Sequence, residues 1–268
     1  DSCLIAEYAA CPFPSPEIDE SEIIGTAHSP TDGLGIFPDP PVRARYFWRV
    51  RSCYADRRCS PWSPVRYVDV GSGENDINGD GLSDLAVGAE TAYEDGMERG
   101  KAFLLYGTTD VSGPEHPVAL SSPSGEPLAR FGAAVARSGD LDGDGFCDLA
   151  VGADYHDVAE EDEGLVMVYG GAEAGIPTEP TLLLASPIHQ EMARFGSSLS
   201  SGGDLDGDGF DDLVVGAEWA DVEARNEGVV FVSLGSESGI GAVPDLMIEN
   251  TEHQEGGHFG NSCSCGGD

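Results

Sequence analysis

Short apolar runs alternate with segments rich in glycine, proline and acidic residues along most of the chain. Runs such as LAVGA, LVMVY and TLLLA are continuously apolar, which is typical of strands that are covered on both faces. No stretch of useful length has the 3.6-residue period of an amphipathic helix. In one representative stretch the pattern predicts four strands, at residues 130–138, 148–153, 164–169 and 180–185. We therefore expect an all-β protein.

The same pattern recurs at a fixed interval. The segments DINGDGLSDLAVGA, DLDGDGFCDLAVGA and DLDGDGFDDLVVGA, at 76–89, 140–153 and 204–217, begin 64 residues apart. The segments before them, ARFGAAVARSGD, ARFGSSLSSGGD and GHFGNSCSCGGD, keep the same step, and the last ends at Asp268. The chain thus has three loop-bearing repeats and the start of a fourth. Because it also lacks an initiator Met, we expect it to be part of a longer protein.

A four-stranded sheet that repeats with both faces covered is typical of a β-propeller, in which each blade packs against the next. A β-solenoid is the structural alternative, but 64 residues is long for one coil. The sequence therefore favours a partial propeller.

Each repeat carries an acidic loop with a metal-ligating pattern. Oxygen-bearing side chains occupy loop positions 1, 3, 5 and 9, a glycine at position 6 allows a sharp turn, and the position 7 carbonyl adds a backbone oxygen. Calcium takes six to eight oxygen ligands. The predicted ligands are Asp76, Asn78, Asp80, Leu82 and Asp84 in the first loop, Asp140, Asp142, Asp144, Phe146 and Asp148 in the second, Asp204, Asp206, Asp208, Phe210 and Asp212 in the third, and Asp268 in a truncated fourth site.

Three alternatives to calcium loops are weaker. Asp-Gly pairs also form ordinary turns, but three loops with acids at matching positions would crowd carboxylates that repel one another. Magnesium prefers rigid octahedra that keep several waters, and zinc would favour His or Cys ligands.

In a helix–loop–helix hand a Glu stands at position 12, whereas here Val87, Val151 and Val215 do, so the bidentate role falls to position 9. Asn78 removes one charge, which predicts that the first site is the weakest.

Charge divides the chain and excludes two classes of partner. The net charge is −36, with −3 in residues 1–71 and −33 in residues 72–268. Such a field repels nucleic acid and anionic lipid surfaces, and no apolar run approaches the roughly 18–20 residues that span a bilayer. We expect a domain boundary near 71–73, no nucleic-acid partner and no membrane insertion within this stretch. The acidic run at 154–163 is expected to be a solvated loop.

The ordered pattern RFG…GDLDGDGFCDLAVGA resembles the FG-GAP repeats of integrin α-chain amino-terminal propellers and of bacterial surface proteins, over about 74–268. The match includes Phe131-Gly132 with Val151-Gly152-Ala153, whereas Arg66-Tyr67-Val68 replaces the RFG of the first repeat. The resemblance implies a seven-bladed calcium-binding propeller, of which this chain supplies less than half. It also implies a role in adhesion or recognition, secreted or at the cell surface.

Residues 1–71 resemble part of a fibronectin type III domain. The strand YFWRVRSC at 46–53 and the segment CSPWSPV at 59–65 are similar to the closing hairpin of that family. The resemblance implies a seven-stranded β-sandwich that lacks its first strands here.

Seven cysteines suggest an oxidising compartment. Cys53 and Cys59 flank a predicted hairpin turn, and a Cys3–Cys11 pair is similarly close, so both pairs are candidate disulfides. The remaining thiols are Cys147, at loop position 8 and not a predicted ligand, and Cys263 and Cys265, which are predicted to share one face of a strand.

Catalytic motifs are absent from the sequence. The six histidines form no metal-binding pair of the HxH or HExxH type, and no nucleophile elbow, phosphate loop or dinucleotide motif occurs. We expect a non-enzymatic calcium-dependent module that recognises a protein or glycan ligand, whose identity the sequence does not specify. An accessory part of a larger secreted enzyme is the alternative.

Overall fold

The computed structural model describes residues 43–48, 61, 66–71, 75–109 and 117–265. All strand ladders in these ranges are antiparallel, and no residue in them is helical. The all-β prediction is therefore confirmed for this part of the chain. Consistently, the described residues contain no helix that is long and apolar enough to cross a membrane.

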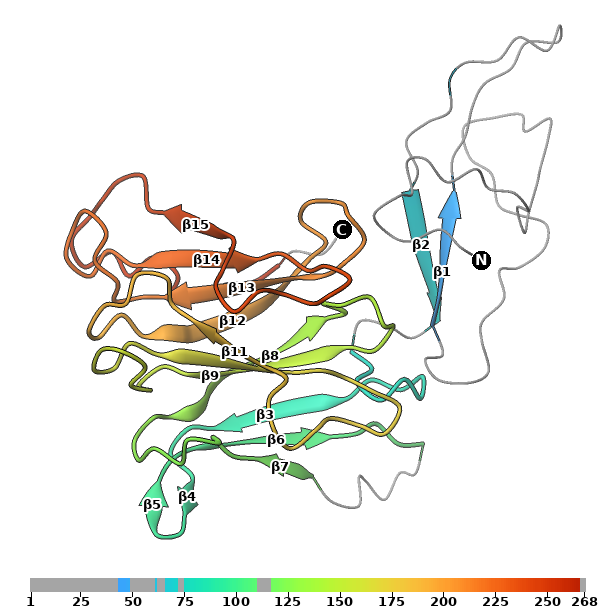
Figure 1. Cartoon of the computed structure of the whole chain (residues 1–268), viewed down its shortest axis with the longest axis horizontal. Coiled ribbons are helices and arrows are strands. Elements are labelled where there is room, and N and C mark those ends of the chain that lie inside the picture. Colours follow the sequence, from blue (N-terminus) through green and yellow to red (C-terminus); the bar gives the residue numbers. More distant parts are fainter. Residues whose placement is uncertain (1–42, 49–60, 62–65, 72–74, 110–116, 266–268) are drawn as a thin grey trace, which may run out of the picture.

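Three sheets, which we call blades 1 to 3, follow one another in chain order and pack face to face (Figure 1). Blades 2 and 3 are four-stranded meanders in which consecutive strands pair. This arrangement is consistent with a partial β-propeller; a solenoid would instead stack parallel strands. The strands are β3 (Leu85–Ala89), β6 (Lys101–Leu105) and β7 (Val118–Leu120) in blade 1, β8 (Phe131–Gly139), β9 (Asp148–Ala153), β10 (Leu165–Tyr169) and β11 (Leu182–Ala185) in blade 2, and β12 (Phe195–Gly203), β13 (Asp212–Ala217), β14 (Val229–Ser233) and β15 (Leu246–Glu249) in blade 3.

Blade 1 departs from the four-strand pattern. Its sheet has the order β3-β6-β7, and β4 (Tyr93–Glu94) and β5 (Met97–Glu98) form a separate small hairpin. The segment that aligns with the first strands of the other repeats, β2 (Arg66–Gly71), pairs instead with β1 (Arg43–Trp48). One reason is local: Val68 stands where Gly132 has a positive φ of 88°, a conformation that a β-branched residue disfavours.

The hairpin expected within residues 46–65 is correct only in part. Strands β1 and β2 do pair antiparallel, but β2 begins at Arg66, so the expected second strand at 59–65 is wrong at Pro61, which is not in a strand. Proline lacks the N–H that a ladder requires, and Pro61 and Pro64 both lie in that stretch. The rest of the predicted fibronectin-like domain, with Cys3, Cys11, Cys53 and Cys59, lies outside the described residues.

The core lies between the blades. Alternate residues of a strand point to opposite faces of the sheet, so Leu149 and Val151 of β9 pack with Leu104 of blade 1. The intervening Ala150 packs with Phe195 and other residues on the blade 3 side. Two buried clusters result, one at each interface, which explains why the strands are continuously apolar.

Glycines let neighbouring blades approach closely. A Cβ added to Gly152 of β9 would collide with the backbone carbonyl oxygen of Gly196 in β12. The same contact joins Gly88 to Gly132 and Gly216 to Gly260. The Phe-Gly pair at the start of each repeat and the Gly-Ala pair of the preceding one are therefore the two sides of one inter-blade contact.

Candidate metal centre

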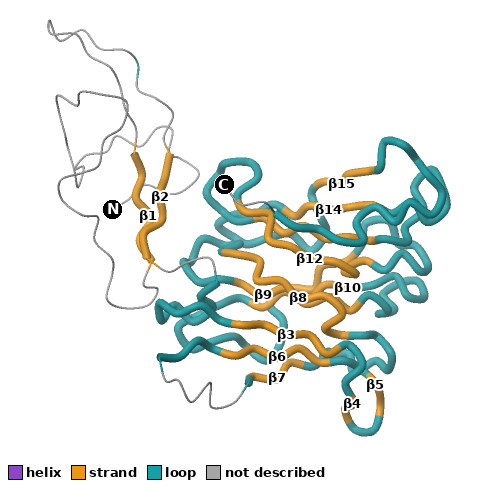
Figure 2. Tube along the Cα trace, turned by 180° about the vertical axis from the view of Figure 1, so that it is seen from behind, coloured by secondary structure: helices purple, strands orange, loops and turns teal. Residues whose placement is uncertain are grey.

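The predicted loops lie at corresponding places in the blades. The second loop joins β8 to β9 and the third joins β12 to β13, while the first precedes β3. Figure 2 shows these connections at the same end of blades 2 and 3. The second and third loops are therefore held by the first two strands of their blades, as the repeat spacing predicts, whereas the first loop has only β3 of its own blade beside it.

Carboxylates converge in the second and third loops. One oxygen from each of Asp140, Asp142 and Asp144 lies within 4.8 Å of the others, and Asp204, Asp206 and Asp208 form the same group. Calcium–oxygen bonds are about 2.3–2.6 Å long, so two ligands of one ion lie at most about 5 Å apart. The oxygen-only donor set and its spacing therefore fit one calcium ion in each loop.

Backbone N–H groups hold these carboxylates in place. In the second loop, Gly145 N donates to Asp140 Oδ2 at 3.0 Å, Asp144 N to Asp142 Oδ1 at 3.1 Å and Phe146 N to Asp144 Oδ1 at 2.9 Å. The corresponding bonds occur in the third loop, at 2.9, 3.1 and 3.0 Å. The loop backbone thus orients the side chains before any ion binds.

The electrostatics of the loops disfavour uncompensated negative charge. Asp144 and Asp208 are exposed by surface area, but partial desolvation within the loop raises their pKa above the ordinary value, and neighbouring loop carboxylates add to the shift. Burial, with a smaller contribution from Asp142 and Asp140, raises the pKa of Asp148 to about 8. A bound divalent cation would remove this repulsion, since it favours the charged form of each carboxylate.

The position 9 aspartates have a role that the sequence pattern did not suggest. Asp148 is buried, and its two oxygens accept hydrogen bonds from Leu141 N and Gly171 N, both at 2.9 Å. These donors belong to loop position 2 and to the connection after the third strand. The position 9 carboxylates stand outside the convergent groups, and their bidentate coordination stays a prediction. Asp84 and Asp212 make the equivalent bonds.

The first loop has the same backbone but fewer charges. Gly81 N donates to Asp76 Oδ2 at 2.7 Å and Leu82 N to Asp80 Oδ1 at 2.8 Å, as in the other loops. Asn78 donates its Nδ2 to Asp80 Oδ2 at 3.2 Å. Its weaker metal binding stays a prediction, as do the position 7 carbonyl ligands. Asp268 lies outside the described residues.

Neighbouring loops are bonded to each other. Asp140 N donates to Asp211 Oδ2 at 2.8 Å, and Asp211 N donates to the carbonyl of Asp140 at 3.0 Å. Between the first and second loops, Cys147 N donates to the carbonyl of Asp76 at 3.1 Å. Burial raises the pKa of the Cys147 thiol to about 12; that this residue is not a metal ligand stays a prediction.

The opposite ends of the blades carry a stacked ladder that the sequence analysis missed. The Arg130 and Arg194 guanidinium groups lie 4.8 and 4.6 Å from the Tyr155 ring centroid, and Arg194 also lies 4.4 Å from that of Trp219. The His258 ring follows, 5.0 Å from Trp219. The 64-residue step relates Arg130, Arg194 and His258, so alignment of the repeats was the signal that could have revealed them.

The acidic run at 154–163 is only partly solvated, which corrects its prediction. Asp154 and Glu163, at its two ends, are buried, while its middle is exposed. Asp154 pairs with Arg130 at 3.1 Å. Glu163 accepts hydrogen bonds from Ala159 N at 3.0 Å and pairs with His189 Nδ1 at 2.7 Å. A buried carboxylate is stable only with such partners.

Comparison with known proteins agrees with this geometry. Residues 195–233 match the FG-GAP repeat. This stretch runs from β12 through the third acidic loop to the end of β14, so it contains the aspartates of that loop.

The chain is also similar to integrin α chains. It is 40% identical to integrin alpha-4 of Xenopus laevis over 161 residues and 39% identical to human integrin alpha-IIb over 171 residues, each covering 59% of this chain. It is 38% identical to integrin alpha-PS3 of Drosophila melanogaster over 147 residues, or 53% of this chain. The matched regions span only 12–16% of the length of these relatives.

Proposed function

We propose that this chain is a non-enzymatic, calcium-binding recognition or adhesion module that acts outside the cell, and that calcium stabilises its blades. The observation that carries the proposal is the convergence of three aspartates in each of two loops at equivalent positions. Similarity to integrin α chains and to the FG-GAP repeat supports an adhesive role, with a protein or glycan as the ligand.

The position of the loops explains how an ion would act. The second and third loops each join two adjacent strands. Asp148 ties the second loop to the connection after the third strand of its blade. An ion held by Asp140, Asp142 and Asp144 would neutralise their repulsion and fix this end of the blade. With a dissociation constant of about 0.1 mM and about 2 mM extracellular calcium, each site would add roughly 1.8 kcal/mol to the free energy of unfolding.

Calorimetric titration and thermal unfolding of the chain with calcium test this proposal. We expect heat of binding from at least two sites and a melting temperature that rises with calcium and falls in excess chelator. Asp144→Asn and Asp208→Asn should each remove one site, whereas Glu173→Gln, an exposed acid outside the loops, should remove none. An unchanged number of bound ions in both loop variants would refute the assignment of the loops as metal sites. A larger rise in melting temperature with magnesium than with calcium would show that magnesium, not calcium, is the bound ion.

A further inference from the structure

The second acidic loop is held by the following blade as well as by its own. Position 1 of this loop is Asp140, and position 8 of the third loop is Asp211. Asp211 N donates to the Asp140 carbonyl at 3.0 Å, and Asp140 N donates to Asp211 Oδ2 at 2.8 Å. Ser236 N, in the connection after β14, donates to the carbonyl of Leu141 at 3.1 Å. Three hydrogen bonds thus join blade 3 to the first two residues of the second loop.

The side chain of Asp211 fits closely into this contact. A Cβ added to Gly139, the residue directly before Asp140, would collide with the Asp211 carboxylate. Gly139 also has a positive φ of 79°, a conformation that glycine adopts without steric cost. The half-buried Asp211 side chain therefore reaches Asp140 N because a glycine precedes it.

The contact between the first and second loops has the same backbone part. Cys147 N donates to the carbonyl of Asp76, and Ala172 N donates to that of Ile77, both at 3.1 Å. The residue at position 8 is Cys147 in the second loop and Ser83 in the first. The third loop differs from both, because it places a carboxylate at position 8.

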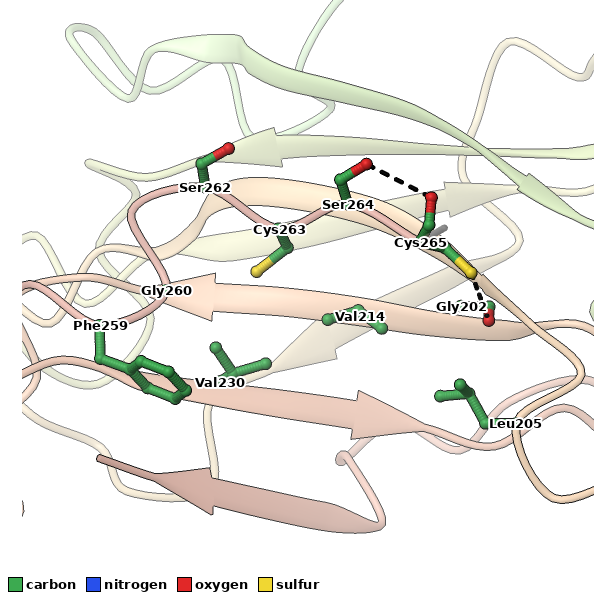
Figure 3. A pocket seen from close by; sticks show the side chains of 10 residues that line it. All are labelled: Gly202, Leu205, Val214, Val230, Phe259, Gly260, Ser262, Cys263, Ser264 and Cys265. Atoms are coloured by element: carbon green, nitrogen blue, oxygen red, sulfur yellow. Dashed lines mark hydrogen bonds between the residues drawn. The ribbon is translucent and has the colours of Figure 1, made fainter. Parts of the chain in front are cut away.

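Exposure shows how much of the second loop blade 3 covers. Leu141, at position 2, is 2% exposed. Its counterpart Leu205 in the third loop is 56% exposed and lines a crevice beside residues 262–265 (Figure 3). Both loops begin with the sequence DLDGDGF, so the burial of Leu141 comes from the blade that follows and not from the loop itself. The second loop is therefore built into a contact between two blades.

Asp211 belongs to the third loop at the same time. It follows Phe210, whose N–H donates to Asp208 Oδ1 at 3.0 Å. It precedes Asp212, which accepts a hydrogen bond from Gly235 N at 2.9 Å. The backbone of Asp211 is thus fixed by the ligand loop of blade 3, while its side chain holds the loop of blade 2.

We propose that Asp211 is a positioning residue of the second calcium site and couples that site to the third. This inference rests on the proposed function, in which the loops bind calcium. The two bonds between Asp211 and Asp140 fix the backbone on both sides of the position 1 ligand before an ion binds. A ligand that is already in place loses less conformational entropy on binding, so the affinity is higher. An ion in the third loop fixes Asp208, and through Phe210 it fixes Asp211. By linkage, an ion in either loop raises the affinity of the other by the same factor.

Calorimetric titration of two single-site chains with calcium tests the positioning role. Asp80→Asn with Asp208→Asn leaves the second loop intact, and Asp80→Asn with Asp144→Asn leaves the third. In these chains Asp211→Ala should raise the dissociation constant of the second loop about fivefold or more and that of the third by less than about twofold. A merely structural role would weaken both loops alike. The titration of the third loop also shows that the Asp211→Ala chain is folded.

The conservative variant separates positioning from charge. An asparagine can accept the bond from Asp140 N without carrying a charge, so Asp211→Asn should leave the affinity of the second loop within about twofold of its starting value. Glu237→Ala is the matched control, because it removes an exposed acid next to Ser236 and should leave both loops unchanged. If Asp211→Asn weakens the second loop as much as Asp211→Ala does, the charge acts and the positioning role is overturned.

The Asp80→Asn chain, which keeps both loops, measures the coupling. The product of its two dissociation constants should be about fivefold or more below the product of the single-site values, and Asp211→Ala should remove this difference. Equal products with Asp211 present would overturn the coupling. If the wild-type chain binds no calcium, the proposed function fails together with this inference. If it binds calcium and Asp211→Ala leaves the second loop unchanged, this inference alone fails.

Discussion

The position 9 aspartates allow a test that separates two roles. One is a structural clamp, by which we mean a carboxylate that holds two backbone segments together through hydrogen bonds, and the other is a metal ligand. Asp148→Ala removes the acceptor of two buried hydrogen bonds, those from Leu141 N and Gly171 N. Each buried donor left without a partner costs about 1–3 kcal/mol, so the simple sum is about 2–6 kcal/mol. Burial raises the pKa of Asp148 to about 8, so the carboxylate itself is costly to bury. We therefore expect a net loss of about 2–3 kcal/mol of unfolding free energy.

The contrast is with Asp144→Ala, at loop position 5. Asp144 Oδ1 accepts one bond, from Phe146 N, at an exposed part of the loop. In excess chelator at pH 7, Asp144→Ala should change the free energy of unfolding by less than about 0.5 kcal/mol, as surface substitutions usually do. In calcium, both variants should lose the increment contributed by the second site.

Urea unfolding followed by tryptophan fluorescence measures both variants, with and without calcium. If Asp148→Ala in chelator unfolds at the same urea concentration as the wild type, the two hydrogen bonds contribute nothing measurable and the clamp is refuted. If Asp144→Ala is equally destabilised in chelator, the division between ligand and clamp is wrong.

Three further predictions concern the interfaces and the buried acids. Gly152→Ala should lower the melting temperature, because the added Cβ collides with the Gly196 carbonyl. Gly170→Ala is the control, since a Cβ has room there, and it should melt near the wild-type temperature. Equal melting temperatures of the two variants would contradict the close contact. Arg194→Lys should cost about 0.5–2 kcal/mol through loss of its stacking on Tyr155 and Trp219, measured by urea unfolding, and an unchanged midpoint would show that the ladder is not stabilising. Burial raises the pKa of Asp154 from 3.8 to about 6 despite its pairing with Arg130. The contribution of this group to the free energy of unfolding is therefore full below about pH 4 and is lost as the pH rises to about 6. The total loss is about 3 kcal/mol. Asp154→Asn should remove that slope, and parallel pH profiles of the two proteins would refute the shift.

The loops show how far the sequence was sufficient. Which residues recur is visible in the chain itself, so the aspartates at positions 1, 3 and 5 could be predicted, and the structure brings those of the second and third loops together. The strands of blade 2 were likewise predicted to within two residues at each end, because their apolar runs and glycine-rich boundaries are local features.

Properties that depend on a neighbouring blade were not predictable in this way. Three of them depend on segments that are distant in the sequence. They are the hydrogen bond from Gly171 to Asp148, the burial of Asp154 and Glu163, and the stacking of Arg194 between Tyr155 and Trp219. The pairing of β2 with β1 is of the same kind, since a strand can pair with any suitable edge that the fold places beside it. By itself, the sequence determined the repeat, the strands and the acidic loops; the tertiary structure decided which carboxylates are buried and what each one contacts, because burial and pairing arise only when the blades pack.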